Sequence, residues 1–174
     1  FLIGGTFEEK NSNALALTAS NFTSNDLIYN IANAVTQKVT KDTEAKYRYM
    51  ALFSRFNYSY DNKYLVNLTL RRDGSSRFGA NNRFANFGAI GTAWIFSREK
   101  FLENVSWMNL AKVRTSFGTA GSDLIGDYQY LNTFGITAIP YDNIVSLQPL
   151  RLYNPDFSWE KTTKFETALE FELF

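Results

Sequence analysis

The residues of this chain that could act as acids and bases are carboxylates. Glu99 and Glu103 are four residues apart, and a pair of carboxyl groups can supply the acid and base of a glycoside hydrolase. Asp156 and Glu160 have the same spacing. The first pair, however, lies in 98–109, where apolar residues predict a short amphipathic helical turn with solvated charges. We therefore expect no catalytic residues here and interpret the protein as a non-enzyme.

The 174-residue chain contains neither histidine nor cysteine. Ser-His-Asp and Cys-His machinery, and the commonest zinc and iron ligand sets, cannot be assembled without them. No disulfide framework is available either. The Asp73-Gly-Ser75 bend lacks the long oxygen-ligand spacing of a calcium loop and is interpreted as a plain turn. We expect no metal site and no cofactor.

The composition limits which partners we expect for the chain and how the chain could cross a membrane. The net charge is +1, which gives no reason to expect nucleic acid as a partner. Aromatic residues make up 17% of the chain, yet no apolar run reaches the roughly 18 residues of a membrane-spanning helix. Any span must be built from strands. Both ends lie inside apolar segments, so we expect a piece cut from something longer, and the missing signal peptide is uninformative.

Two alternating segments, 47–60 and 64–73, are joined by Asp61-Asn-Lys63 and predict a β-hairpin. On the second strand, apolar residues fall on one face and polar residues on the other, as in a strand between an apolar phase and water. The apolar face holds Tyr64, Val66, Leu68 and Leu70, and the polar face holds Asn67, Thr69, Arg71 and Asp73.

Aromatic residues gather beside the hairpin turn. Tyr58, Tyr60 and Tyr64 flank it, and Trp94 and Phe96 at the end of the next strand would join them at one height. A ring of Tyr and Trp beside short turns is typical of the interfacial girdle of an outer-membrane barrel. In a soluble sandwich the same residues would form core, so both interpretations stay open at this point.

The chain predicts six strands, and the last has the clearest alternation. The fourth strand carries mostly small side chains, so the sequence does not show which of its faces is apolar. The strands are expected at 1–8, 47–60, 64–73, 84–97, 110–118 and about 160–174, with connections at 10–46 (including a helix at about 25–35), 61–63, 74–83, 98–109 and 119–159.

The connections alternate between long and short, so in an up-and-down barrel all the long ones fall on one side of the membrane. The expected fold class is therefore all-β: an antiparallel up-and-down transmembrane β-barrel segment of about six strands, with long extracellular loops and short periplasmic turns. We expect residues 1–174 to form part of one barrel domain.

Five motifs occur in the order seen in the SusC/RagA-like TonB-linked outer-membrane proteins (TonB-dependent transporters), which the chain resembles over about 47–174. Weaker support comes from 21–27. Two departures, at 87–91 and 121–122, concern local loop geometry. The motifs are Asp61-Asn-Lys-Tyr-Leu, Arg72-Asp-Gly-Ser-Ser-Arg-Phe-Gly with Asn82-Arg83, Trp94 with Ser97-x-Glu99-x-Phe101, Arg114-x-Ser-Phe-Gly-x-x-Gly121 and Asn154-Pro-x-x-x-Trp-Glu-Lys-Thr162.

The resemblance implies an arc from the C-terminal half of a plugged barrel of the roughly 22-stranded transporter class. Such proteins lie in the Gram-negative outer membrane and import bulky nutrients. They work with a SusD-like surface lipoprotein lid and draw energy from the TonB complex through an N-terminal segment that this piece lacks, as it lacks the plug. Family grounds favour an oligosaccharide substrate first and a peptide second.

Within this implied function, solute contacts would come from aromatic residues of the loops. Tyr128, Tyr130, Tyr141 and Trp159 are the candidates, because their rings can stack on sugars or peptide side chains. The alternative is that they only pack the loops and the lipoprotein contact. Two other functions stay open: a soluble all-β carbohydrate-binding module, and a passive porin-like channel.

Overall fold

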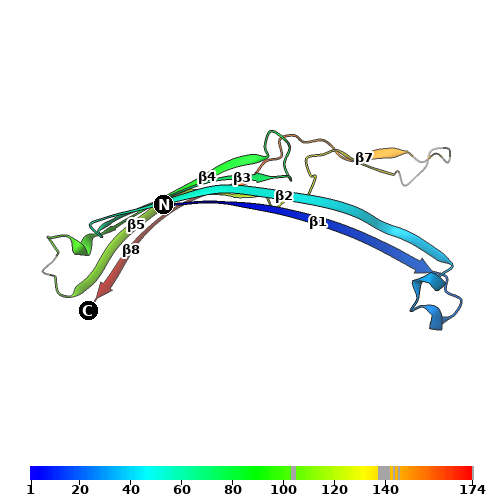
Figure 1. Cartoon of the computed structure of the whole chain (residues 1–174), viewed down its shortest axis with the longest axis horizontal. Coiled ribbons are helices and arrows are strands. Elements are labelled where there is room, and N and C mark those ends of the chain that lie inside the picture. The colour runs from blue at the N-terminus through cyan, green and yellow to red at the C-terminus, as the bar shows by residue number, and fades with distance from the viewer. Residues whose placement is uncertain (103–104, 137–141, 143, 145, 174) are drawn as a thin grey trace. The chain divides into compact units, whose positions relative to one another are not determined.

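The structure is a computed structural model that describes residues 1–102, 105–136, 142, 144 and 146–173. Within these ranges it contains strands and three short 3-10 helices (Figure 1). The strands are β1 (Leu2–Ser20), β2 (Thr36–Tyr60), β3 (Tyr64–Ser75), β4 (Phe84–Ile95), β5 (Met108–Ser122), β6 (Thr133–Ile136), β7 (Leu147–Arg151) and β8 (Glu160–Leu173), and the helices are η1 (Asn25–Leu27), η2 (Ile31–Asn33) and η3 (Phe96–Arg98).

Six strands form one sheet in the order β1-β2-β3-β4-β5-β8 (Figure 1). The pairs β2–β3, β3–β4, β4–β5 and β5–β8 are all antiparallel. Strands β6 and β7 form a separate antiparallel pair inside the connection from β5 to β8. The predicted all-β, antiparallel up-and-down sheet is therefore confirmed. No helix among the described residues is long and apolar enough to cross a membrane.

The chain divides into two compact units. One consists of Phe1–Glu8 and Arg48–Phe174, and we call it the wall unit. The other is Glu9–Tyr47, the C-terminal part of β1 and the N-terminal part of β2 with the loop that joins them. Inside this second unit the Thr40 hydroxyl donates to the carbonyl of Ala16 at 3.2 Å.

The prediction that 10–46 is a loop is wrong, because β1 continues to Ser20 and β2 begins at Thr36. Only 21–35 connects them. Most residues of the two strand extensions are polar and exposed, and the apolar run Ala14–Leu17 of β1 does not alternate with polar residues. Their sequence therefore carries no sustained alternation that would distinguish a strand from a loop.

The helix predicted at 25–35 is also absent. Two 3-10 turns, η1 and η2, stand in its place, separated by residues 28–30. Asn30 adopts an extended backbone, and its side-chain oxygen accepts a hydrogen bond from the Ala32 N–H at 3.0 Å. Such a local bond competes with the helical one, which explains why an apolar stripe at helical spacing does not form an α-helix.

The remaining differences concern element ends. Strand β5 runs from Met108 to Ser122 and is longer than the predicted 110–118. The predicted helical turn at 98–109 is η3 followed by tight turns, in which the Leu102 N–H donates to the carbonyl of Glu99 at 2.9 Å. Glu103 lies outside the described residues. Strands β6 and β7 lie in a segment predicted to be loop.

One face of the wall unit's sheet is apolar across five strands. Rows of directly opposite residues can be followed from β2 to β8 through the pairing register. In one row the exposed fractions lie between 37% and 69%, whereas a soluble sandwich would bury these side chains. This row is Phe56, Leu68, Ile90, Phe117 and Phe165.

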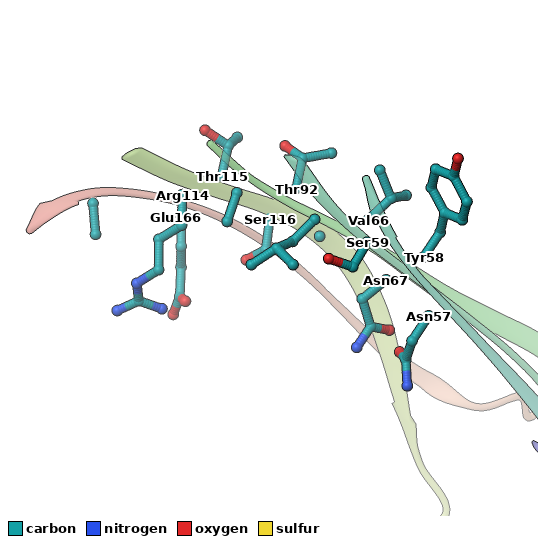
Figure 2. A pocket seen from close by; sticks show the side chains of 14 residues that line it. Asn57, Tyr58, Ser59, Val66, Asn67, Thr92, Arg114, Thr115, Ser116 and Glu166 are labelled. Atoms are coloured by element: carbon teal, nitrogen blue, oxygen red, sulfur yellow. The ribbon is translucent and has the colours of Figure 1, made fainter. Parts of the chain in front are cut away.

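The opposite face carries mostly polar or small side chains. The neighbouring row consists of Asn57, Asn67, Gly91, Ser116 and Glu166. Figure 2 shows the side chains of Asn57, Asn67, Ser116 and Glu166 pointing to one side of the sheet, and those of Tyr58, Val66, Thr92 and Thr115 pointing to the other. The register thereby assigns the small-sided strand β4, which the sequence left open: Ile90 belongs to the apolar face and Gly91 to the polar one.

Because the sheet is a single layer, few described side chains of the wall unit are buried. The largest fully buried one is Phe78, in the connection between β3 and β4. Phe87 and Ser75 are buried as well. The densest packing of this unit therefore lies where the connection 76–83 contacts its surroundings.

Candidate functional site

The connection between β3 and β4 contacts the start of the long connection between β5 and β8. The Ser75 hydroxyl, 1% exposed, donates to the Asp123 carboxylate at 2.7 Å. Arg77 donates through Nε to the Asp127 carboxylate and through Nη1 to the Asp123 carbonyl, each at 2.9 Å. Three polar contacts therefore fix residues 123–127 to this connection.

The same connection also contacts the end of the long one. The Asn82 amide donates to the carbonyl of Pro155 at 3.1 Å, and the Trp159 indole N–H donates to the carbonyl of Arg83 at 3.3 Å. We call Ser75, Arg77, Phe78 and Asn82 the clasp, because these four side chains hold both ends of the 123–159 connection.

Trp159 lies in an aromatic cluster at the clasp. Its ring centroid is 5.1 Å from that of Phe78 and 5.7 Å from that of Phe87, the latter in an edge-to-face arrangement. Such pairs contribute about 0.5–1.5 kcal/mol each beyond the area they bury. Trp159 is half-buried, so it packs the base of the loop and still presents part of its ring to the surroundings.

Tyr128 and Tyr130 lie on the segment that the clasp holds. Tyr128 directly follows Asp127 and is 38% exposed. Tyr130 is half-buried, its ring faces Gly79 of the β3–β4 connection, and its carbonyl accepts a hydrogen bond from the Asn154 N–H at 3.0 Å. The structure thus brings Tyr130 and Trp159 to the same connection. The fourth candidate, Tyr141, lies outside the described residues.

The residues that position these aromatics were missed by the sequence-based interpretation. Ser75 and Arg77 belong to the Arg72–Gly79 motif, which was used only as a family signal. Their partners Asp123 and Asp127 lie about fifty residues later, and no local pattern pairs them. The one sequence signal for such a contact is the run of polar residues in this motif, because a polar side chain that becomes buried needs a hydrogen-bond partner.

Of the five aromatic residues predicted beside the hairpin turn, Tyr58 stacks on Phe56 instead, with ring centroids 6.5 Å apart. The other four, Tyr60, Tyr64, Trp94 and Phe96, form a row at the turn end of the sheet, to which the structure adds Phe171. Adjacent ring centroids along it are 5.7–6.4 Å apart. Glu99 accepts hydrogen bonds from the Tyr64 hydroxyl at 2.7 Å and from the Trp94 indole at 3.2 Å. Lys63 adds an ion pair at 3.4 Å. The polar tips of two rings are thus bound to one carboxylate.

These contacts also bear on Glu99 as a candidate acid. The Tyr64 hydroxyl, and after it the Trp94 indole and Lys63, hold the pKa of the Glu99 carboxyl below its ordinary value of 4.5. A general acid needs the opposite shift. The described residues contain no group of three or more acidic side chains that could hold a metal ion.

A groove of about 410 Å³ crosses β2–β5 and β8 and is lined mainly by residues of the polar face (Figure 2). Gly91 and Ala93 leave room there because their side chains are small. Arg114 lines the groove and pairs with Glu170 at 2.6 Å, and Lys112 pairs with the same carboxylate at 2.7 Å. Most of the exposed lining is apolar, and the amides of Asn57 and Asn67 and the hydroxyls of Ser59 and Ser116 lie within it.

An antiparallel up-and-down sheet with an exposed apolar face, a polar opposite face and aromatic residues at its turn end is a segment of a transmembrane β-barrel wall. Comparison with solved structures supports this fold. The chain matches the RagAB peptide transporter with a TM-score of 0.84 and 28% identity, over 99% of this chain and 19% of that one. A RagAB peptide importer in an "open-open" state matches with a TM-score of 0.81.

Sequence relatives give the same family. The TonB-dependent receptor SusC of Bacteroides thetaiotaomicron is 34% identical over 142 residues, which is 78% of this chain and 14% of that protein. A TonB-dependent receptor of Formosa agariphila is 36% identical over 124 residues, or 71% of this chain and 12% of that protein. The chain belongs to the SusC/RagA-like TonB-dependent receptors, and it spans less than a fifth of the length of these relatives. No protein-family profile matches it.

Proposed function

We propose that this chain is part of an outer-membrane active transporter of Gram-negative bacteria that imports bulky nutrients. In this proposal residues 1–174 belong to one transmembrane barrel domain, and the chain supplies an arc of its wall with outer loops. The observation that carries the proposal is the apolar row from Phe56 to Phe165, exposed on a sheet whose other face is polar. The family membership supports the same function.

The energy source and the lid are proposed from the family. The TonB complex drives import through a segment that precedes the barrel, and a SusD-like surface lipoprotein closes the extracellular mouth. The names of the relatives, TonB-dependent receptors and a RagAB transporter, support both partners. The loops 76–83 and 123–159 face outward in this arrangement, toward solute and lid, and the 61–63 turn faces the periplasm.

The solute is proposed to be an oligosaccharide or a peptide. Tyr128, Tyr130, Tyr141 and Trp159 are its proposed contacts, because aromatic rings stack on both kinds of ligand. Similarity to a protein described as a peptide transporter supports the peptide. No catalytic residue, metal or cofactor takes part in this function.

Two other functions compete with this one. A soluble carbohydrate-binding module would have to cover the apolar face with protein, and the wall unit exposes it. A passive porin-like channel shares the wall but needs neither energy nor a lid.

Uptake by a deletion strain complemented with the full-length gene tests the proposal. Fluorescent tryptic peptides of casein and fluorescent malto-oligosaccharides serve as the two probes. We expect one of them to accumulate only in the complemented strain, and less when the lid protein's gene is also deleted. Equal accumulation of both probes with and without the gene would contradict import.

A further inference from the structure

Arg77 contacts the long loop at two separate points. Its Nε donates to the side chain of Asp127 and its Nη1 to the backbone of Asp123, each at 2.9 Å. The Arg77 and Asp127 side chains are only 22% and 28% exposed, so their ion pair is screened less than one on an open surface. The planar guanidinium fixes the direction of both bonds at once.

Ser75 supports the same arrangement through its own hydrogen bonds. Its buried hydroxyl donates to Asp123 at 2.7 Å and accepts from the Arg77 N–H at 3.3 Å. The backbone of Ser75 is itself held, since its N–H donates to the carbonyl of Arg83 at 3.0 Å. Arg77 therefore acts from a fixed position on the wall and not from a free loop.

The residue that follows Asp127 has an unusual backbone. Tyr128 has a φ of 58°, a left-handed conformation that residues with bulky side chains seldom adopt. Such a conformation persists only where neighbouring contacts hold it. The Arg77–Asp127 pair lies immediately before it, and a turn bond from the Leu131 N–H to the Tyr128 carbonyl, at 3.1 Å, lies immediately after it.

We propose that Arg77 is a positioning residue for solute binding: its contacts with Asp123 and Asp127 hold the backbone that presents the Tyr128 and Tyr130 rings to the solute. This inference rests on the proposed function, in which these tyrosines contact the solute. Arg77 itself touches no solute. Its loss leaves the wall strands intact, because the buried Phe78 and the pairing of β3 with β4 do not depend on the guanidinium.

The test uses the full-length transporter with Arg77→Gln, and Asp127→Asn as a second variant that removes the same ion pair from the other side. Hydrogen exchange of a peptide covering 123–131 reports loop order without any solute. We expect exchange about twofold to fivefold faster in both variants, the range that loss of a partly exposed ion pair implies. Peptides from β3, β4 and β5 should be unchanged.

Arg72→Gln is the matched control. It removes the same charge five residues earlier, from a side chain that lies over the Phe84 ring and contacts Asn86 rather than residues 123–127. Exchange in 123–131 should keep its wild-type rate in this variant. A charge-swapped double variant, Arg77→Asp with Asp127→Arg, should recover at least part of the protection that either single change removes.

Uptake kinetics with the casein peptides and the malto-oligosaccharides complete the test. We expect the half-saturation concentration of the transported probe to rise about twofold to fivefold in Arg77→Gln, with an unchanged maximal rate. Faster hydrogen exchange in 123–131 with an unchanged half-saturation concentration for uptake would overturn the positioning role of Arg77 but would not contradict import. Wild-type exchange in both single variants would overturn it outright. Absence of uptake by the wild type contradicts the proposed function instead, and the exchange data distinguish that failure from the others.

Discussion

The indole ring of Trp94 stacks on the phenol ring of Tyr64 directly across the β3–β4 ladder, with centroids 6.4 Å apart and 6° between the ring planes. Both rings direct a polar atom at one carboxylate, that of Glu99. An aromatic body with a bound polar tip suits the boundary between hydrocarbon and water. This pair therefore sets the level at which the apolar face ends.

The apolar face should tolerate charge much less than the polar face. Leu68→Arg should cost about 2–4 kcal/mol of folding free energy if the site is near the bilayer midplane. Thr69→Arg, on the opposite face of β3, should cost far less. Refolding titrations into lipid vesicles measure the difference, and equal costs on the two faces would rule out the lipid assignment. Glu170 is unsuitable as a control because it pairs with Lys112 and Arg114.

Acid should loosen the aromatic row. The pKa of the Glu99 carboxyl is lowered in the folded state, chiefly by the Tyr64 hydroxyl. Its stabilisation is therefore complete above the ordinary value of 4.5 and is lost as the pH falls through the lower, folded-state pKa. We expect the fluorescence of Trp94, isolated as the difference from a Trp94→Phe variant, to change in that window. Glu99→Gln should abolish the pH-dependent step, and its persistence would exclude Glu99 as the cause.

The clasp should contribute much of the stability of the outer loops. Phe78 is fully buried against Trp159, so Phe78→Ala should cost about 3–5 kcal/mol through lost contacts and a cavity. Limited proteolysis should then cleave 123–136 in the variant and spare it in the wild type. Phe134→Ala removes a ring of the same size that is 56% exposed, and it should have little effect. Identical cleavage in all three proteins would show that Phe78 does not secure the loop.

The proposed orientation places the 123–159 connection outside the cell and the 61–63 turn in the periplasm. An epitope tag inserted after Asn143 should be accessible to antibody on intact cells, and a tag inserted after Asn62 should not. Permeabilised cells provide the control, since both tags should then react. The reverse labelling would invert the proposed topology.

The strands of the wall could be predicted from sequence because their two faces have opposite polarity. Alternation at 64–70 and 161–173 is strong, and β3 and β8 are found there. The same criterion failed where polarity does not alternate. The extensions of β1 and β2 contain no buried residue, and η1 and η2 replace a helix because the Asn30 side chain bonds to its own loop.

The candidate site was only partly predictable. Loop aromatics such as Tyr128 and Trp159 could be named from residue type, but the clasp that positions them joins residues about fifty positions apart. Such a contact follows from the register of β3, β4, β5 and β8 taken together. No single segment of the sequence contains that register.

Energy-dependent uptake tests the central claim most directly. In cells that express the full-length protein, uptake of the transported probe should stop when an uncoupler dissipates the inner-membrane proton gradient, and it should return when the uncoupler is removed. Deletion of the TonB complex should have the same effect as the uncoupler. Uptake that continues undiminished without the gradient and without TonB would contradict an active transporter and identify the wall as that of a passive channel.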